Sequence, residues 1–599
     1  MFFLKLLLLL LIKILNKLYF KKSLLGNNWK IKECSERESL TISQKHNLPI
    51  NISKLLATRD IKDSQVKNFF EPDINNYILD PFVLKDMEKS VNRTIQAIVS
   101  NQKIGIITDY DVDGSTSAAV LNNFLSSFGC TTIIKVPDRL KEGYGPNLRL
   151  INELLDEKID LLFTLDCGTT SFDIFDSSKI NFKDVIVIDH HMSELKFPDV
   201  FAIINPNRFD ENNSLKELAA VGITFLFVMA LRKKLREKNY FDSSFKEPNL
   251  LNYLDLVALG TVCDVVKLTN YNRFFVHKGL EIIKKRHNKG ITKIIDNSKF
   301  NHTPTSTDLG FVIGPQLNAA SRIDDSNLSS KILISNNLNE IEIISKKLLL
   351  LNEKRKLIEN QILNESLEQA NKQTNKKFIL VHGFGWHKGV LGIVASKLVD
   401  KFNKPSFVIS LDSYIGIGSA RSINKIDLGK IILQAKYEGI LISGGGHKMA
   451  AGIKINKQSI NLFDEYLSSI FNDFDISNFE KNEYFDLKIS VNEINNDLVN
   501  YIEMFEPFGN GNKEPKFIIH GLKIDTHKII KDKHLLFFFK TDLGLKFKAI
   551  CFNCIGTNLG ENLIKNKLAN YDFGCTINRD NFDSELKPQL IIKDAIIID

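Results

Sequence analysis

Carboxylate and imidazole side chains follow three apolar runs in the first third of the sequence. The run 104–108 leads into Asp109, Asp111 and Asp113, the run 161–165 into Asp166, and the run 185–188 into Asp189, His190 and His191. Continuous apolar runs of this length are typical of buried parallel strands, and open parallel sheets bind ligands beyond the carboxyl ends of their strands. Crowded carboxylates repel one another unless a cation neutralises them. The three runs therefore predict a divalent-metal site that acts on a phosphate.

The first acidic segment lies where a strand is expected to turn into a helix. Alternate residues of an extended turn point the same way, so we expect Asp111 and Asp113 to share a cation. Gly114 permits a tight turn at this point. The alternative is a solvated acidic turn with serine caps, but three aspartates directly after a buried strand favour the metal site.

The adjacent histidines are a sharper signal. At a strand end, one imidazole faces the crevice while the other orients a ligand or meets the substrate. Neutral imidazole suits Mn²⁺, whereas Mg²⁺ prefers oxygen ligands. Asp264 ends the apolar helix expected over 254–262, where it is either a further ligand or a polar residue that closes the helix.

A second group of residues suits an anion. Gly444–His447 is interpreted as a glycine-rich turn whose backbone N–H groups can approach a phosphate, with a plain loop as the alternative. The segment Gly418–Ser422 contributes Arg421 together with the hydroxyl of Ser419. An arginine beside hydroxyl groups is a typical phosphate-binding combination.

The elements that position these residues follow from the patterning. Strand-like and helix-like runs alternate from about Val91 to Ser330, which predicts a doubly wound parallel sheet. Apolar residues at helical spacing predict one long helix over 339–375, a strut between two domains. A second α/β domain follows, and alternating residues after Phe485 predict a small antiparallel barrel. The expected boundaries are 1–34 for an N-terminal extension, 35–335 for the parallel-sheet domain with its N-terminal helical region, 336–376 for the long helix, 377–476 for the second domain and 477–599 for the barrel.

Composition limits the class of protein. The chain of 599 residues is 43% hydrophobic and 25% charged, as in ordinary globular proteins, and is too long for one core. Its net charge of +8 fits a polyanionic partner. Seven scattered cysteines suit a reducing cytoplasm, so we expect a cytoplasmic protein. The apolar segment Met1–Ile12 is short for a membrane span, and we expect it to have no role in the chemistry, although a membrane-surface helix is an alternative.

From about Leu24 to its C-terminus, the chain resembles the RecJ family of single-stranded-DNA exonucleases, within the DHH phosphoesterase superfamily. Many spaced motifs in one order carry this resemblance. They are Asp109–Gly114, Val136–Gly145, Leu165–Gly168, Asp189–His191, Ala258–Val266, Leu317–Arg322, Gly418–Ser422, Gly444–His447 and Glu506–Gly509.

The resemblance implies a metal-dependent 5′-to-3′ exonuclease for single-stranded DNA in repair and recombination, with an OB-fold-like tail. It implies two ions, Mn²⁺ or Mg²⁺, and as partners single-stranded DNA, a helicase and a single-strand-binding protein. The chain is expected to be a monomer without a stable membrane partner. The implied metal ligands are Asp111, Asp113, Asp166, His190 and Asp264, with Asp109 and His191 close by. The implied substrate-binding residues are Arg139, Ser419 and Arg421 for the 5′-terminal phosphate, and Arg322, Gly445, Gly446 and His447.

Two positions depart from the family pattern, since Gln316 stands where Arg is usual and Ser321 where Gly is common. The first puts the strength of DNA binding in question. In the tail, Lys531, Lys533, Phe537 and Lys548 are candidates to hold the strand by charge and stacking, with barrel core as the alternative for Phe537.

Two rival functions are considered. A phosphodiesterase for short oligonucleotides or cyclic dinucleotides is disfavoured by the long helix and the tail. A catalytically silent DNA-binding scaffold is disfavoured because every implied ligand is present.

Overall fold

The computed structural model describes residues 22–77, 80–176, 182–241, 246–300, 302–540, 546–566, 568–580 and 586–598. Met1–Ile12 therefore lies outside the described residues. Contacts divide the chain into two compact units. Of the described residues, one unit contains those in 74–474 and 507–512, and the other contains those in 22–73, 475–506 and 513–598. The helical region before Asp73 thus groups with the C-terminal part of the chain, whereas the patterning placed it with the parallel-sheet domain.

A five-stranded parallel sheet begins the first unit, as predicted. Its strands are β2 (Ile104–Thr108), β3 (Thr132–Lys135), β4 (Leu161–Leu165), β5 (Val185–Ile188) and β6 (Ala202–Ile204), in the order β3-β2-β4-β5-β6. Along β2, Ile104 and Ile106 pack into one core and Ile107 into another. Alternate residues of a strand face opposite sides, so this sheet buries both faces.

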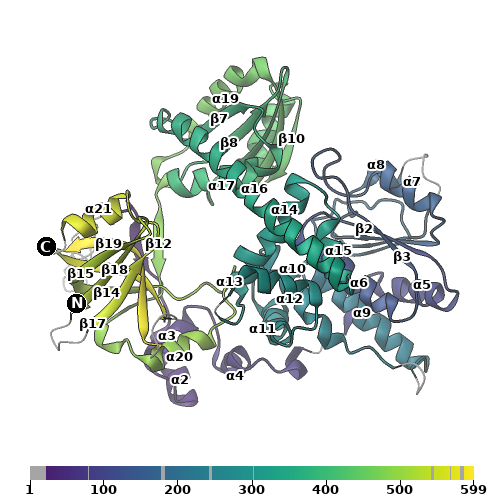
Figure 1. The fold of residues 1–599 in the computed structure, drawn as a ribbon, viewed down its shortest axis with the longest axis horizontal. Coiled ribbons are helices and arrows are strands. Elements are labelled where there is room, and N and C mark those ends of the chain that lie inside the picture. The colour runs from purple at the N-terminus through teal and green to yellow at the C-terminus, as the bar shows by residue number, and fades with distance from the viewer. Residues whose placement is uncertain are drawn as a thin grey trace, which may run out of the picture. The chain divides into compact units, whose positions relative to one another are not determined.

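Helices cover both faces of this sheet, and Figure 1 shows α7 and α8 on one side with α5, α6 and α9 on the other. Because both faces are covered, the crevice at the strand ends is the open part of the sheet. The helices are α5 (Met87–Val99), α6 (Val112–Ser126), α7 (Leu148–Asp156), α8 (Phe172–Phe175), α9 (Ala220–Glu237), α10 (Leu254–Cys263), α11 (Asn270–Lys284), α12 (Lys289–Ser298), α13 (Ser306–Asp308), α14 (Gly314–Ile323) and α15 (Leu328–Ile334), with a π-helical turn over Leu309–Ile313.

The predicted long helix is present as α16 (Leu338–Asn371), which is about 50 Å long at 1.5 Å per residue. The side chain of Asn337 caps it by accepting from the backbone N–H groups of residues 339 and 340. Ile341 and Leu348 belong to the core of the parallel-sheet domain, whereas Ile362 and Ala370 belong to the core of the next domain. One uninterrupted helix therefore ties the two cores together.

The second domain of this unit is a mixed sheet in the order β10-β11-β9-β8-β7. Its elements are β7 (Ile379–Phe384), α17 (Leu391–Phe402), β8 (Ser406–Leu411), β9 (Ile415–Arg421), α18 (Leu428–Tyr437), β10 (Ser443–His447), β11 (Ala450–Asn456) and α19 (Ile460–Asn472). The glycine-rich segment is edge strand β10, so the predicted turn at Gly444–His447 is wrong. Without side chains, glycines give no alternation that would distinguish an edge strand from a turn.

The other unit contains a seven-stranded sheet in the order β13-β14-β18-β19-β17-β16-β15. Its strands are β13 (Leu487–Ile489), β14 (Phe517–Leu522), β15 (Ile524–Ile530), β16 (His534–Lys540), β17 (Lys546–Cys551), β18 (Asn570–Arg579) and β19 (Pro588–Ile598). Strand β1 (Asn28–Ile31) pairs with β12 (Asn482–Phe485), and Asp594 accepts from Asn27 and Trp29. The helices are α2 (Glu36–His46), α3 (Ile50–Ala57), α4 (Val66–Phe70), α20 (Asn496–Met504) and α21 (Asn558–Lys565).

Among the residues that the structure describes, no helix combines the length and the apolar character that crossing a membrane requires.

Candidate metal centre and phosphate-binding residues

The first acidic segment is divided between a strand end and a helix start. Asp109 follows β2, and Asp111 is the N-cap of α6, its side chain accepting from the backbone N–H of Gly114 at 3.1 Å. Asp113 lies inside the first turn of α6, where its carboxylate accepts from Ala220 and Val221 at 2.7 and 2.9 Å. Those two N–H groups begin α9, and a helix N-terminus favours a negative charge. The N-terminus of α9 thereby fixes Asp113 in the crevice.

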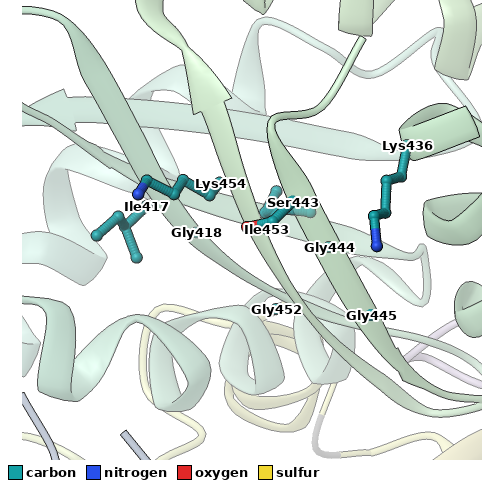
Figure 2. Close-up of a pocket in the computed structure, with 9 residues that line it drawn as sticks. All are labelled: Ile417, Gly418, Lys436, Ser443, Gly444, Gly445, Gly452, Ile453 and Lys454. Atoms are coloured by element: carbon teal, nitrogen blue, oxygen red, sulfur yellow. The ribbon is translucent and has the colours of Figure 1, made fainter. Parts of the chain in front are cut away.

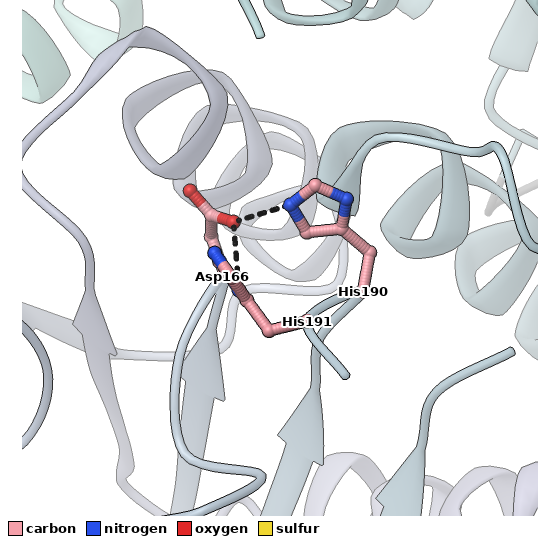
Figure 3. Close-up of side chains that lie close together, drawn as sticks. All are labelled: Asp166, His190 and His191. Atoms are coloured by element: carbon pink, nitrogen blue, oxygen red, sulfur yellow. Dashed lines mark ion pairs between the residues drawn. The ribbon is translucent and has the colours of Figure 1, made fainter. Parts of the chain in front are cut away.

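The strand ends converge with the end of α10, as the parallel sheet predicts. Nε2 of His190 lies 3.3 Å from Oδ1 of Asp166 and 4.0 Å from Oδ2 of Asp113, and Nδ1 lies 3.7 Å from Oδ2 of Asp264. Figure 3 shows both histidines beside Asp166, which follows strand β4. Three groups have ligand atoms within 4.8 Å of one another, namely Asp109–Asp111–Asp166, Asp113–His190–Asp264 and Asp166–His190–His191.

This grouping bears on one detail of the sequence prediction, that Asp111 and Asp113 share a cation. Asp111 groups with Asp109 and Asp166, whereas Asp113 groups with His190 and Asp264, so the two aspartates do not belong to the same group. The physical reason is that α6 begins at Val112. Residues two apart on a helix point in different directions, unlike residues two apart on an extended segment.

The residues suit a divalent cation, because some of their carboxylate oxygens have no hydrogen-bond partner among the described residues. Asp109 and Asp166 are buried, and one carboxylate oxygen of each has no hydrogen-bond partner in the structure. Buried carboxylate oxygens without partners are costly. Oxygen ligands with one imidazole suit Mn²⁺ well and accommodate Mg²⁺, so a cation would satisfy both the charge and the unpaired oxygens.

Asp189 holds the second histidine. Its carboxylate accepts from the backbone N–H groups of His190 and His191 and lies 2.8 Å from Nδ1 of His191. The Tyr144 hydroxyl lies 3.0 Å from the same nitrogen and donates to the backbone carbonyl of Asp166 at 2.9 Å. Because the His191 side chain is 43% exposed, one face of its ring remains accessible to substrate.

The pKa values show how strongly the site favours a cation. Burial, and then the neighbouring carboxylates, raise the pKa of Asp109 and Asp166 well above the ordinary carboxyl value. Burial and the Asp111 charge raise the pKa of Asp113 to about 7, against the opposing effect of the α9 N–H groups. Burial and Asp113 raise the pKa of Asp264 to about 9. Without a cation, the carboxyl groups therefore retain protons that a metal must displace.

The pKa values of the two histidines are shifted in opposite directions. Burial, with the charge of His191, lowers the pKa of His190, which keeps its imidazole neutral as a ligand requires. Burial also disfavours the charged form of His191. The hydrogen bond between His191 and Asp189 has the larger net effect and raises the pKa of His191 to about 9. The same bond, against burial, lowers the pKa of Asp189. The structure thus pairs one neutral and one cationic histidine.

We expect Mn²⁺ affinity to rise with pH. Asp113 and Asp264 have pKa values of about 7 and about 9, so protons compete with the ion below those values. The dissociation constant, measured by calorimetry in buffers of different ionisation enthalpy, should fall from about pH 6 to about pH 9 with proton release. A dissociation constant that does not change over this interval would contradict the coupling.

The same pKa shifts determine the effect of Mn²⁺ on stability. Folded-state pKa values above the ordinary 3.8 mean that the folded protein binds more protons than the unfolded chain, so the metal-free protein loses stability as the pH rises through this range. Mn²⁺ removes that penalty. It should therefore raise the melting temperature more at about pH 8.5 than at about pH 6.

Four arginines form a cluster beside the metal groups. The guanidinium of Arg139 lies over the Tyr110 ring, 4.6 Å from its centroid. Burial, and then Arg139 and Arg355, lower the pKa of Arg322 to about 9. Burial and Arg139 likewise lower the pKa of Arg421. Cations that repel one another in a buried position are stabilised by a bound anion such as a phosphate.

Arg322 also joins the two domains of this unit. Its Nη1 donates to the backbone carbonyl of Gly389 at 2.9 Å. A methyl group on Gly389 would lie 2.2 Å from the backbone oxygen of Arg322, so only glycine permits this approach. Arg421 lies against the first turn of α17, where a methyl group on Gly392 would come within 2.9 Å of its Nη2. The contact between the domains thus orients arginines from both.

A groove lies beside Ser419 on the second domain. Ser419, Gly452 and Gly445 pair across β9, β11 and β10, and a methyl group on Gly445 or Gly452 would meet nothing within 4 Å. Figure 2 shows the groove, of about 490 Å³, with Lys454 and Lys436 beside the glycines. Gly446 and His447 belong to the same edge strand but do not line this groove.

The departures from the family pattern lie inside the fold. Gln316 is buried and donates to Ser298 at 2.8 Å and to the Val312 carbonyl at 3.2 Å, so its side chain does not face a strand of DNA. Ser321 is buried too, and its hydroxyl donates to the carbonyl of Asn318. Both side chains are thus held inside the fold by hydrogen bonds.

The four candidate DNA-binding residues of the tail differ in how exposed they are. Phe537 is fully buried and packs against Phe539 and Phe573, so it belongs to the core. Lys548 forms an ion pair with Asp580. Lys531 and Lys533 are exposed at the turn between β15 and β16. The predicted alternating strand is present as β17 from Lys546, and its predicted first residue, Leu545, lies outside the described residues.

The sequence does not reveal three residues that support the site. Asp189 stands out there only as the neighbour of the histidines, Tyr144 only as part of a motif, and Arg355 not at all. Arg355 is buried on α16, where its side chain donates to Asn352 and Glu359. A helix rich in Lys and Glu gives no signal that one of its arginines faces inward.

Family models match three segments of the chain. The DHH family N-terminal domain matches residues 103–261, the DHHA1 domain residues 375–473, and the RecJ OB domain residues 485–594. The first covers the strand ends that carry the aspartates and histidines, and the second covers the mixed sheet with Ser419 and Arg421.

Solved structures share the fold. The structure of Thermus thermophilus RecJ in complex with Mn²⁺ matches 95% of this chain and 80% of its own, with a TM-score of 0.78 at 23% identity. A structure of exonuclease RecJ bound to manganese matches 65% of this chain and 96% of its own, with a TM-score of 0.56 at 28% identity.

Relatives resemble the chain over most of its length. The single-stranded-DNA-specific exonuclease RecJ of Haemophilus influenzae is 33% identical over 80% of this chain and 86% of its own. The Escherichia coli protein of that name is 31% identical over 82% and 86%, and the Bacillus subtilis protein is 29% identical over 95% and 71%. The metal groups, the arginine cluster and these similarities agree, and the chain belongs to the RecJ family.

Proposed function

We propose that this protein is a single-stranded-DNA-specific exonuclease that hydrolyses phosphodiester bonds in the 5′-to-3′ direction. The observation that carries the proposal is the meeting of aspartates and histidines from β2, β4, β5 and α10 within 4.8 Å, in groups that fit cations. The names of its relatives support the substrate.

The cofactor is Mn²⁺ or Mg²⁺, with two ions bound. The groups Asp109–Asp111–Asp166 and Asp113–His190–Asp264 share no residue, so each would hold one ion with carboxylates of its own. The third group joins them, since it contains Asp166 from the first and His190 from the second. When bound, such a pair acidifies an attacking water and stabilises charge on the leaving oxygen. The solved RecJ bound to manganese, at 28% identity, supports this cofactor.

The chain's own residues orient the strand. Arg139, Arg421 and the Ser419 hydroxyl hold the 5′-terminal phosphate, and Arg322, which is electrostatically coupled to Arg139 and Arg421, contributes further positive charge. Anchoring the end places the first phosphodiester at the metals, which makes the enzyme an exonuclease. Exposed His191, oriented by Asp189, is placed to donate a hydrogen bond to a phosphate oxygen.

Specificity for single strands also indicates the partner proteins. Because only single strands are substrates, a helicase that opens duplex DNA and a single-strand-binding protein are the partners we propose, in repair and recombination in the cytoplasm. The match of residues 485–594 to the RecJ OB domain supports a nucleic-acid-binding role for the C-terminal part, since OB folds bind single strands by stacking and charge.

A nuclease assay tests the proposal. The full chain is incubated with 5′-phosphorylated single-stranded DNA and Mn²⁺, beside duplex DNA, a dinucleotide, a cyclic dinucleotide and a metal-free control. We expect mononucleotides from the single strand alone and only with metal. Preference for the dinucleotides would favour an oligonucleotide phosphodiesterase, and binding without cleavage would favour a silent scaffold.

A further inference from the structure

The segment Pro507–Asn512, called the strap below, contacts the loop that follows Asp264, although about 240 residues separate the two in the chain. We propose that the strap is a positioning element for the metal site and that Asn510 is its key residue. The inference rests on the proposed function in one respect, namely that Asp264 is a metal ligand.

The loop after Asp264 has an unusual backbone. Asp264 ends α10, and Val265 follows in the left-handed region with φ of 61°. Glycine is usual at this position after a helix, because a side chain on the β-carbon is disfavoured there, most of all a branched one. Val265 is 64% exposed, so packing of its own side chain does not hold this conformation.

Hydrogen bonds from the strap hold the left-handed backbone at Val265. Nδ2 of Asn510 donates to the backbone carbonyl of Val265 at 2.8 Å, and the backbone carbonyl of Asn510 accepts from Leu268 at 2.7 Å. One asparagine therefore clamps both ends of the turn 265–268. The turn is the direct continuation of the helix end that carries Asp264, so its geometry sets the direction of that carboxylate.

The strap is itself rigidly built. Gly509 and Asn512 exchange backbone hydrogen bonds at 2.9 and 3.2 Å, and the buried Asn512 side chain donates to the Pro507 carbonyl at 2.9 Å. The Ser306 hydroxyl donates to the Phe508 carbonyl at 2.7 Å. These bonds tie the strap to itself and to the first unit, so Asn510 is held in place before it meets Val265.

Close approach explains the glycines of the strap. A methyl group on Gly509 would lie 2.6 Å from Cδ1 of Leu268, and one on Gly511, whose φ is 77°, would lie 3.0 Å from Cβ of Lys267. Larger residues would push the strap away from the loop. The metal site thus depends on a segment in the last sixth of the chain, far in sequence from every proposed ligand.

The test is Mn²⁺ binding by the full-length protein, measured by calorimetry and by electron paramagnetic resonance of free Mn²⁺, for wild type, Asn510→Ala, Val265→Asn and the double variant. Asn510→Ala should weaken binding of one ion about tenfold or more, the usual effect of losing a group behind a ligand. Val265→Asn should bind normally, because asparagine tolerates the left-handed region. In the double variant, affinity should recover to within about twofold of wild type, because residue 265 then needs less support.

Controls separate the possible results. Asn336→Ala, at an exposed asparagine before α16, should bind as wild type does. If Asn510→Ala fails to fold by circular dichroism, Asn510→Asp carries the same expectation, since it keeps the size and removes the N–H donors. Wild-type affinity in Asn510→Ala would overturn the proposal, and so would a double variant that recovers nothing. A wild-type protein that binds no Mn²⁺ would instead refute the proposed function.

Discussion

Replacement of His190 by Ala should abolish metal-dependent cleavage while single-strand binding persists. The imidazole lies within 4.0 Å of Asp113, Asp166 and Asp264, so its loss removes a ligand shared by two of the metal groups. The activity should fall by more than the roughly 10–100-fold that follows loss of a group behind a ligand. Turnover of a 5′-phosphorylated single strand at saturating Mn²⁺ measures the activity, and fluorescence anisotropy measures binding.

The matched control is His287→Ala, since His287 is an exposed histidine of the same unit outside the metal groups. That variant should keep its activity. Asp113→Ala should also be inactive, but it removes the cap of α9 as well, so its melting temperature should fall. Near-normal turnover by His190→Ala would refute the metal site described here.

Replacement of Arg421 by Ala should selectively impair the use of 5′-phosphorylated ends. A charge-assisted hydrogen bond contributes about 1.5–3 kcal/mol, which corresponds to roughly 10- to 150-fold in kcat/KM at about 1.36 kcal/mol for each tenfold. Because Arg421 belongs to none of the metal groups and supplies no ligand atom, Mn²⁺ affinity should change little. Kinetics on matched strands with a 5′-phosphate or a 5′-hydroxyl measure the effect.

The variant Arg421→Lys tests what the guanidinium adds. Lysine keeps the charge but loses the planar pair of donors, so activity on 5′-phosphorylated strands should recover only in part. Equal losses on phosphorylated and unphosphorylated strands would contradict the role of Arg421 in anchoring the end.

The sequence by itself determined the fold class and the types of residue at the site. Strands β2, β4 and β5 are buried along their whole length and mainly apolar because helices cover both faces of the sheet, and such runs are visible without a structure. Parallel strands align their carboxyl ends, so local patterning was enough to predict that Asp166 and His190 meet. The long helix was likewise visible, because its apolar spacing is local.

Only the tertiary structure decided which carboxylates belong together. The start of α6 at Val112 separates Asp111 from Asp113, and helix boundaries depend on capping contacts such as that between Asp111 and Gly114. The strand β10 was mistaken for a turn for a related reason. Its glycines have no side chains, so only pairing with β11 reveals the strand.

The supporting contacts could not be predicted from the sequence, because they join segments that are far apart in the chain. The N-terminus of α9 holds Asp113 across 107 residues, and Asn510 reaches Val265 across 245. A strained backbone at Val265 can be recognised only from its dihedral angle and from the group that holds it. Residue types and local periodicity determined what this site is made of, whereas long-range hydrogen bonds and burial decided how its charges are grouped and held.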